Sequence, residues 1–137
     1  MNIIEKAKAL RKLIQEYAEK SEDKTLIIAT ANYFEEWTPN KYNVGDIRLN
    51  ANGIPKECMI EHDSTVNTDW TIDTASIWKA YHSRKKEYAL PWEKPTGAHD
   101  MYLKGEYMIW EDGYTYLCNM DTVYSPSEYH QAWSIIQ

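Results

Sequence analysis

The sequence predicts an α+β fold in which a short N-terminal helical segment is followed by two small antiparallel β modules. Two observations support this prediction: an apolar pattern of helical spacing over residues 2–20, and a sequence repeat whose two copies span residues 42–58 and 102–118. Such a repeat indicates that one supersecondary unit occurs twice in the fold. The shared positions are Tyr42/Tyr102, Gly45/Gly105, Asp46/Glu106, Ile47/Tyr107, Leu49/Ile109, Asn52/Asp112, Gly53/Gly113 and Cys58/Cys118.

Residues 2–20 are expected to form an amphipathic helix. Its apolar residues recur at alternating steps of four and three, the spacing of helix–helix packing. They are Ile3, Ala7, Leu10, Ile14 and Tyr17. A seam of little more than two heptads is marginal by itself and needs a surface to pack on. Two partners remain open: the chain's own second helix, or further copies of the chain.

A second helix is expected to follow a break at residues 21–23. The acidic residues there favour a helix that starts near Glu22. The apolar run 26–31 has strand propensity as well, and we interpret it as helix. Trp37-Thr38-Pro39 then ends the helical segment.

Three parts of the chain follow from these boundaries. Residues 1–36 form the helical, oligomerisation segment, residues 37–82 the first module and residues 90–137 the second module. The charged linker 82–90 between the modules contains the run Arg84-Lys85-Lys86, which we interpret as solvent-exposed.

Each module is expected to begin with a β-hairpin. Asn52-Gly53 and Asp112-Gly113 are typical of two-residue type I′ turns, which need positive φ at both central residues. The flanking residues alternate in polarity as strands do.

Alternation within the first hairpin assigns residues to faces of the sheet. Ile47 and Leu49 point to one face, and Asn50 points to the other. The repeat therefore predicts that Trp110, which is equivalent to Asn50, lies on the outer face. Lys56 stands at a core position, and its ammonium must reach water or a partner.

Composition limits the classes of function. The net charge of −6 disfavours nucleic acid and anionic membranes as partners. The chain has six Trp and eleven Tyr residues, which are typical of thin sheets in which one edge of a ring is packed and the other edge contacts solvent. The chain has no long apolar span and no signal peptide, so we expect it to be made in the cytoplasm. Cys58 and Cys118 are expected to be buried free thiols.

No residue pattern indicates an enzyme, a cofactor or a metal site. The four histidines are scattered, and neither cysteine belongs to a Cys-x-x-Cys motif. His62-Asp63 and His99-Asp100 are adjacent pairs on extended chain, where side chains point apart, so we interpret these histidines and aspartates as residues that hold turns by bonding backbone groups. Asp46 and Glu106, repeated after glycine, are interpreted in the same way.

Both modules resemble a known family. In the first module the matching residues are Trp37, Tyr42-Asn43-Val44-Gly45-Asp46, Asn52-Gly53, Cys58, His62-Asp63-Ser64, Trp70 and Trp78, which together resemble the small chitin-binding-type carbohydrate-binding modules of families 5 and 12. In the second they are Trp92, Pro95-Thr96-Gly97-Ala98-His99-Asp100, Tyr102, Lys104-Gly105-Glu106, Asp112-Gly113, Tyr124-Ser125-Pro126 and Trp133, similar to a variant common in prophage proteins of Gram-positive bacteria.

The resemblance implies a bacteriophage virion protein, located at a tail, fibre or capsid surface, that contacts other virion proteins and host cell-wall glycan. Its homo-oligomer is expected to be a trimer, by analogy with virion fibres. Related modules hold sugar with a pair of rings after the second hairpin strand, and neither copy has that pair. The remaining candidates for carbohydrate binding are Trp70, Trp110 and Tyr124, whereas Trp37, Trp78, Trp92 and Trp133 are expected in the cores.

Two other functions remain open. The chain is alternatively a free carbohydrate-binding accessory that targets the cell wall, or an intracellular assembly factor that binds other proteins.

Overall fold

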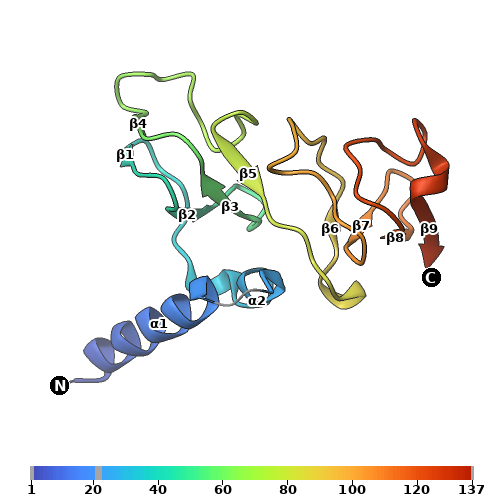
Figure 1. Cartoon of the computed structure of the whole chain (residues 1–137). Helices are drawn as coiled ribbons and strands as arrows, with labels where there is room; N and C mark the ends of the chain where they lie inside the picture. Colours follow the sequence, from blue (N-terminus) through green and yellow to red (C-terminus); the bar gives the residue numbers. More distant parts are fainter. Residues whose placement is uncertain (1, 21–22, 137) are drawn as a thin grey trace.

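The computed structural model describes residues 2–20 and 23–136 and has the predicted α+β fold (Figure 1). A helical segment precedes two small groups of strands that lie side by side in the molecule. The helical segment consists of α1 (Ile3–Lys20), α2 (Thr25–Ala29) and the 3-10 turn η1 (Ala31–Tyr33).

Each module is built on a three-stranded antiparallel arrangement. In the first module it comprises β2 (Ile47–Leu49), β3 (Pro55–Cys58) and β5 (Trp78–Ala80), and β1 (Lys41–Tyr42) pairs separately with β4 (His62–Asp63). In the second module it comprises β7 (Tyr107–Ile109), β8 (Thr115–Cys118) and β9 (Trp133–Ile136). The 3-10 turn η2 (Lys86–Tyr88) lies in the linker, and the 3-10 turn η3 (His130–Ala132) directly precedes β9. Strand β6 (Leu90–Pro91) adds to this sheet in parallel with β7.

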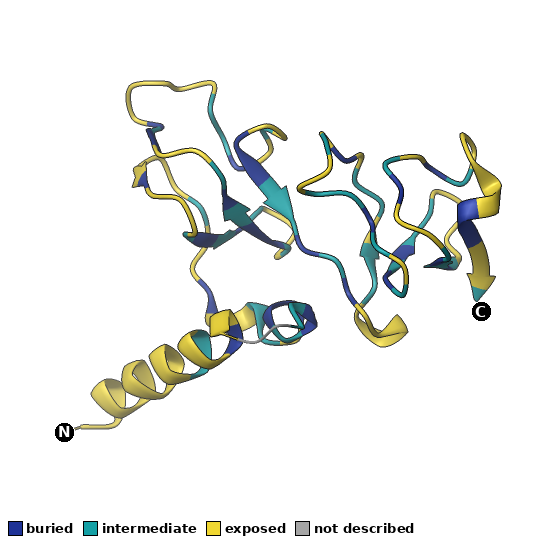
Figure 2. Cartoon of the chain, in the orientation of Figure 1, coloured by how far each residue is buried: buried dark blue, intermediate teal, exposed yellow. Residues whose placement is uncertain are grey.

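Helix α1 covers the predicted range, but the rest of the chain leaves its apolar seam uncovered. Ala18 is its one buried residue, whereas Ile3 and Leu10 are 84% and 56% exposed. Figure 2 shows the helix exposed along nearly its whole length. Packing of the seam on the chain's own second helix, one of the two partners considered, is therefore wrong, because α2 has only five residues.

Helix α2 confirms that the apolar run 26–31 begins as a helix. Asp23 accepts the backbone N–H of Thr25 at 2.9 Å, so an acidic group does precede the first turn. The predicted break and start at residues 21–22 lie outside the described residues.

Both hairpins close with a three-residue loop, and the predicted type I′ turn is wrong. In the first hairpin Gly53 N–H donates to Asn50 O (3.0 Å), and Asn50 N–H donates to Ile54 O (2.9 Å). The second hairpin repeats this pattern around Gly113. In the described part of the chain only glycines have positive φ, so Asn52 cannot take the left-handed position that a type I′ turn requires. The loop is a type I turn followed by a glycine bulge.

The sheet of the first module is covered on both faces. Ile47 and Leu49 face the helical segment, where they pack with Ala18, Ile27 and Phe34. The opposite face carries the module's own core, which contains Tyr42, Cys58, Ile72, Ile77 and Trp78, with Trp37 and Trp70 packed against it.

In the second module the core lies on the cysteine face, and the prediction that Trp110 lies on the outer face is wrong. Met108 and Trp110 point toward Cys118, and Trp110 packs edge-on against Trp92 with ring centroids 5.7 Å apart. The assignment failed because Ile47 and Leu49 are buried by the helical segment, which has no counterpart over β7.

The structural repeat is longer than the sequence repeat. Trp37 N–H donates to Leu49 O (2.9 Å) and Trp92 N–H donates to Ile109 O (2.8 Å), so these tryptophans are equivalent. They are fifty-five residues apart, because the loop before Tyr102 is five residues longer than its counterpart in the first module. The third strand of each module likewise begins with a tryptophan paired with a cysteine: Trp78 with Cys58 and Trp133 with Cys118.

The linker does not leave the modules free to move independently. The ring of His82 stacks on Tyr102 at 3.7 Å between centroids, and Tyr102 stacks on Trp92. Ser83 forms a β-bridge with Tyr107. Residues 84–88 are exposed, as expected for the basic run, although Arg84 N–H donates to Thr25 Oγ1 in α2 (2.7 Å).

Lys56 also joins the modules. It is only 3% exposed, yet its Nζ lies 2.5 Å from Glu93 Oε1 of the second module and 3.9 Å from Asp73 Oδ1. The equivalent residue Tyr116 donates its hydroxyl to Asp112 Oδ2 at 2.6 Å. In both modules a carboxylate thus binds the polar end of this core residue, but for Lys56 the closest carboxylate comes from the second module.

Both cysteines are free and buried, as predicted. Cys58 and Cys118 donate to backbone oxygens of Ile60 (3.2 Å) and Met120 (3.0 Å). Burial raises the pKa of Cys118 to about 11, so the thiol remains protonated at neutral pH and is a poor nucleophile.

We expect Glu93→Gln to lower the free energy of unfolding by about 1–3 kcal/mol, because it leaves the buried ammonium of Lys56 with only the more distant, exposed carboxylate of Asp73. The double variant Lys56→Met/Glu93→Gln should recover most of that loss, since the buried charge is removed as well. Urea denaturation followed by tryptophan fluorescence measures both. Asp73→Asn, at an exposed position, is the control and should change stability by less than about 0.5 kcal/mol. Wild-type stability in Glu93→Gln would contradict the assignment.

Candidate functional site

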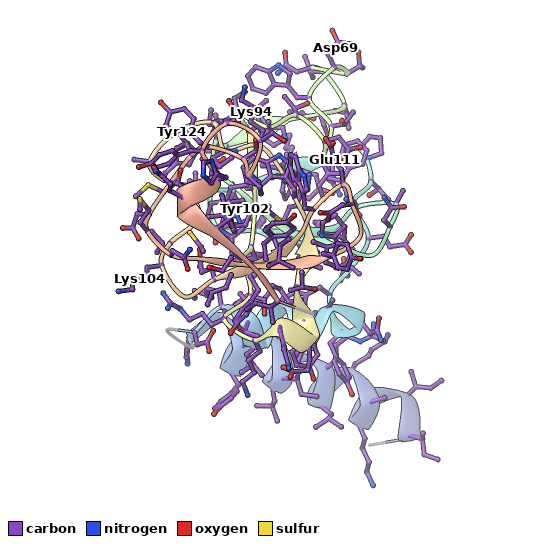
Figure 3. The ribbon with its side chains drawn as sticks, turned by 90° about the vertical axis from the view of Figure 1, so that its right-hand side faces the viewer. Asp69, Lys94, Tyr102, Lys104, Glu111 and Tyr124 are labelled. Atoms are coloured by element: carbon purple, nitrogen blue, oxygen red, sulfur yellow. The ribbon has the colours of Figure 1, made fainter. Side chains whose placement is uncertain are left out.

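The structure does not bring the three predicted sugar-binding residues together. Trp70 belongs to the first module, is half-buried, and packs edge-on against His62 at 5.7 Å. Trp110 is half-buried in the second core. Tyr124 is 53% exposed, and it lies at the margin of the second module whereas Tyr102 lies among its packed side chains (Figure 3).

Tyr124 forms one side of a shallow, mainly apolar groove. The groove is lined by Tyr124, Glu128 and Tyr129, and Tyr129 is 39% exposed. Two exposed rings and a carboxylate therefore line one groove of the second module. They follow Cys118 by several residues, so they are not the ring pair directly after the second hairpin strand that the resemblance implies.

The backbone of Tyr124 is fixed by the core beneath it. Its carbonyl oxygen accepts the indole N–H of Trp133 at 3.0 Å, and its own N–H donates to Thr122 Oγ1 at 3.0 Å. Thr122 in turn forms a β-bridge with Tyr102. The core tryptophan therefore holds the ring-bearing loop in place.

Glu128 and Tyr129, the other two lining residues, are positioned by a capped turn with the sequence Ser125-Pro126-Ser127-Glu128. Ser125 N–H donates to Glu128 Oε1 (3.1 Å), and Glu128 N–H donates to Ser125 Oγ (3.2 Å). These reciprocal bonds form a capping box. Tyr129 N–H donates to Ser125 O at 2.9 Å, so both tyrosines are anchored around Ser125.

Glu128 is ionised in this arrangement. The hydrogen bond from the Ser125 N–H lowers the pKa of the Glu128 carboxyl below its ordinary value. The groove therefore combines two apolar ring faces with a negative group that accepts hydrogen bonds.

Sequence reasoning identified Tyr124 but missed Glu128 and Tyr129. The spacing Ser-x-x-Glu followed by Tyr was the available signal, because it predicts a capped turn that places the next residue beside the loop. The pattern is short, and only the fold shows that the turn brings Tyr129 next to Tyr124.

The histidine–aspartate pairs hold turns, as predicted. Asp63 Oδ1 accepts the N–H of Thr65 at 2.9 Å, and Asp100 Oδ1 accepts the N–H groups of Thr96 and Gly97 at 2.9 and 3.0 Å. His99 Nε2 lies 4.0 Å from Asp100 Oδ1, too far for a hydrogen bond.

The acidic residues after the repeated glycines also serve the backbone. Asp46 accepts the N–H of Asn43 at 2.8 Å, and Glu106 accepts the N–H of Leu103 at 2.6 Å. Glu106 further binds His82 Nδ1 at 3.1 Å. These contacts confirm that the repeated carboxylates cap backbone donors.

A second, polar cavity lies where the modules meet the helical segment. Its lining includes Lys79, Tyr81, His82, Arg84 and Glu106. The hydroxyl of Tyr81 donates to Glu57 Oε1 at 2.8 Å, and burial raises the pKa of Tyr81 well above its usual range. Tyr81, His82 and Glu106 are thus engaged in bonds that hold the junction together.

In residues 2–20 and 23–136 no cluster of three or more His, Cys, Asp or Glu side chains is placed to bind a metal ion. No helix of that part of the chain has the length and apolar character needed to cross a membrane.

No protein-family model matches the chain, and no curated protein is significantly similar to it.

We expect the capping box to weaken at low pH. The pKa of Glu128 is lower in the folded than in the unfolded chain, so its stabilising effect is present above the ordinary carboxyl range and is lost as the pH falls through the lowered value. Hydrogen exchange of the Tyr129 amide should accelerate in Glu128→Gln at neutral pH, relative to wild type.

A suitable control is Glu111→Gln, because Glu111 is exposed in the hairpin loop outside this turn. Equal exchange at Tyr129 in wild type and Glu128→Gln would show that the carboxylate does not support the turn.

Proposed function

We propose that this protein is a surface protein of a bacteriophage virion that attaches to cell-wall glycan through the groove of Tyr124, Glu128 and Tyr129. The exposed ring pair beside an ionised carboxylate is the observation that carries the proposal. A sugar ring presents an apolar C–H face and a rim of hydroxyl donors, which such a groove matches with ring faces and an acceptor oxygen.

The backbone of the groove is held by hydrogen bonds that do not depend on a ligand. Trp133 holds the loop of Tyr124, and the capping box holds Tyr129. Ordering a loop on binding costs affinity, so a preformed pair of rings favours recognition even of a small, weakly held sugar.

The first module lacks an equivalent groove. Position 64 corresponds to Tyr124 in the repeat, and it is occupied by Ser64, which is buried and bonded to Asn40. Its Oγ accepts the Asn40 N–H and donates to the Asn40 carbonyl oxygen, both at 2.8 Å. We therefore assign glycan contact to the second module and a spacing role to the first.

The virion assignment is supported by the resemblance to tandem modules of prophage proteins. Mass spectrometry of purified virions tests it separately from sugar binding. A protein that is present in the infected cell and absent from the particle would indicate an assembly factor, whereas secretion in free form would indicate a cell-wall-targeting accessory.

We expect Tyr124→Ala and Tyr129→Ala each to weaken binding to purified cell wall by about tenfold, which corresponds to the loss of about 1.4 kcal/mol of ring contact. A pull-down over a range of protein concentrations measures the change. The matched control is Tyr114→Ala, which removes an exposed tyrosine that follows the hairpin loop and lies outside the groove.

Tyr114→Ala should bind as wild type does. Unchanged binding by both groove variants would show that this groove is not the binding site. Failure of the wild-type protein to bind any cell-wall preparation would contradict the proposed attachment to glycan.

A further inference from the structure

Helix α1 carries an uncovered apolar face that the proposed glycan contact does not use. The seam residues Ile3, Leu10 and Tyr17 are exposed, and Ile4 and Leu13 beside the seam are exposed as well. In Figure 1 the helix projects from the body of the protein, with its N-terminal part remote from both modules. A contiguous apolar surface of this kind marks an interaction site.

We propose that the occupant of this face is α1 of a second copy of the chain, packed antiparallel in a two-fold symmetric dimer. The alternating four and three spacing of the seam is the pattern by which one helix packs against another. The free part of α1, from Ile3 to about Ile14, spans roughly 17 Å at 1.5 Å per residue and is available to the partner.

The polar side of α1 favours another helix over a membrane surface. It carries Lys6, Lys8, Arg11, Lys12 and Lys20, but also Glu5, Glu16 and Glu19. Helices that lie on anionic membranes have a polar side rich in Lys and Arg. Three acidic residues in that side, on a chain of net charge −6, oppose such a surface.

Charge also selects the orientation. In a parallel pair the residues that flank the seam would place Lys6 of one helix beside Arg11 of the other, on both sides of the interface. Like charges in this position oppose association. A parallel trimer would repeat this contact at each of its interfaces, so the trimer suggested by virion fibres is not the assembly we propose.

The antiparallel arrangement has a register without like-charge contacts. When Ile3 of one copy faces Ile14 of the other, Ala7 faces Leu10, so a small residue lies opposite a large one. The flanking contacts then join Leu13 to the stem of Lys6 and Ile4 to the stem of Arg11, whose charged ends reach water.

This orientation also keeps the two bodies apart. The modules of each chain join its α1 at the C-terminal end of the helix, where Ala18 is buried. Antiparallel packing therefore places the modules of the two copies at opposite ends of the helix pair. Each dimer would carry two glycan grooves facing separate parts of a surface, and linked sites of this kind raise weak affinity by avidity.

The mass of the full-length protein in solution tests the association. We expect light scattering to give a mass that rises from 16.1 kDa toward twice that value as the protein concentration increases. Leu10→Lys should remain monomeric over the same range, and its fold should be intact because Leu10 is exposed. Lys12→Ala, on the opposite side of α1, should associate as wild type does.

Disulfide trapping tests the orientation. An oxidised mixture of Ala7→Cys and Leu10→Cys proteins should yield mainly the mixed disulfide, because these positions face each other in the antiparallel register. Intact mass spectrometry separates it from the two homodisulfides, which a parallel pair would form.

Four results would overturn the proposal: a monomer at every concentration, a limiting mass of three chains, predominance of homodisulfides, or sedimentation of a monomeric wild-type protein with phosphatidylglycerol vesicles. Because none of these experiments involves glycan, their outcome is independent of the cell-wall pull-down.

Discussion

Each module depends on one edge-to-face contact between a tyrosine and a tryptophan over a buried cysteine. Tyr42 meets Trp78 with ring centroids 5.1 Å apart, and Tyr102 meets Trp133 at 5.3 Å. The tyrosine hydroxyl extends to the backbone just after the first tryptophan of its module: Tyr42 binds the Thr38 backbone and Tyr102 accepts the Glu93 N–H. In modules with such small cores the ring pair is a large part of the buried apolar surface, and the neighbouring loops pack on it.

The two cores satisfy their polar groups unequally. The indole N–H of Trp133 is bonded to Tyr124, whereas within the described residues the buried indole N–H groups of Trp37 and Trp78 and the buried ring nitrogen Nε2 of His62 have no hydrogen-bond partner. An unpaired buried donor costs about 1–3 kcal/mol, so the first module relies more on the helical segment and on its neighbour.

Local sequence patterns predicted the helices and strands, whereas the packing of the helical segment and the modules decided which face of each strand is buried. The helical spacing in α1, the glycines of the hairpins and the alternation at Ile47 and Leu49 were sufficient for the fold class. The face of Trp110 could not be predicted, because the helical segment buries Ile47 and Leu49 in the first copy only. Type I′ and bulged loops share the Asn-Gly signal, and the choice between them depends on strand twist and register. For the groove, Tyr124 was recognisable as an aromatic residue outside the predicted cores, but Tyr129 becomes its neighbour only through the capped turn.

The junction between the modules has a mechanical consequence. The His82–Tyr102 stack and the Ser83–Tyr107 bridge hold the start of the linker on the second module, and the Lys56–Glu93 pair connects the modules at a second point. A pulling force applied between α1 and a tethered second module would load these contacts together. Rupture would then require several bonds to break at once, and the chain would transmit tension as one stiff unit rather than extend at its linker.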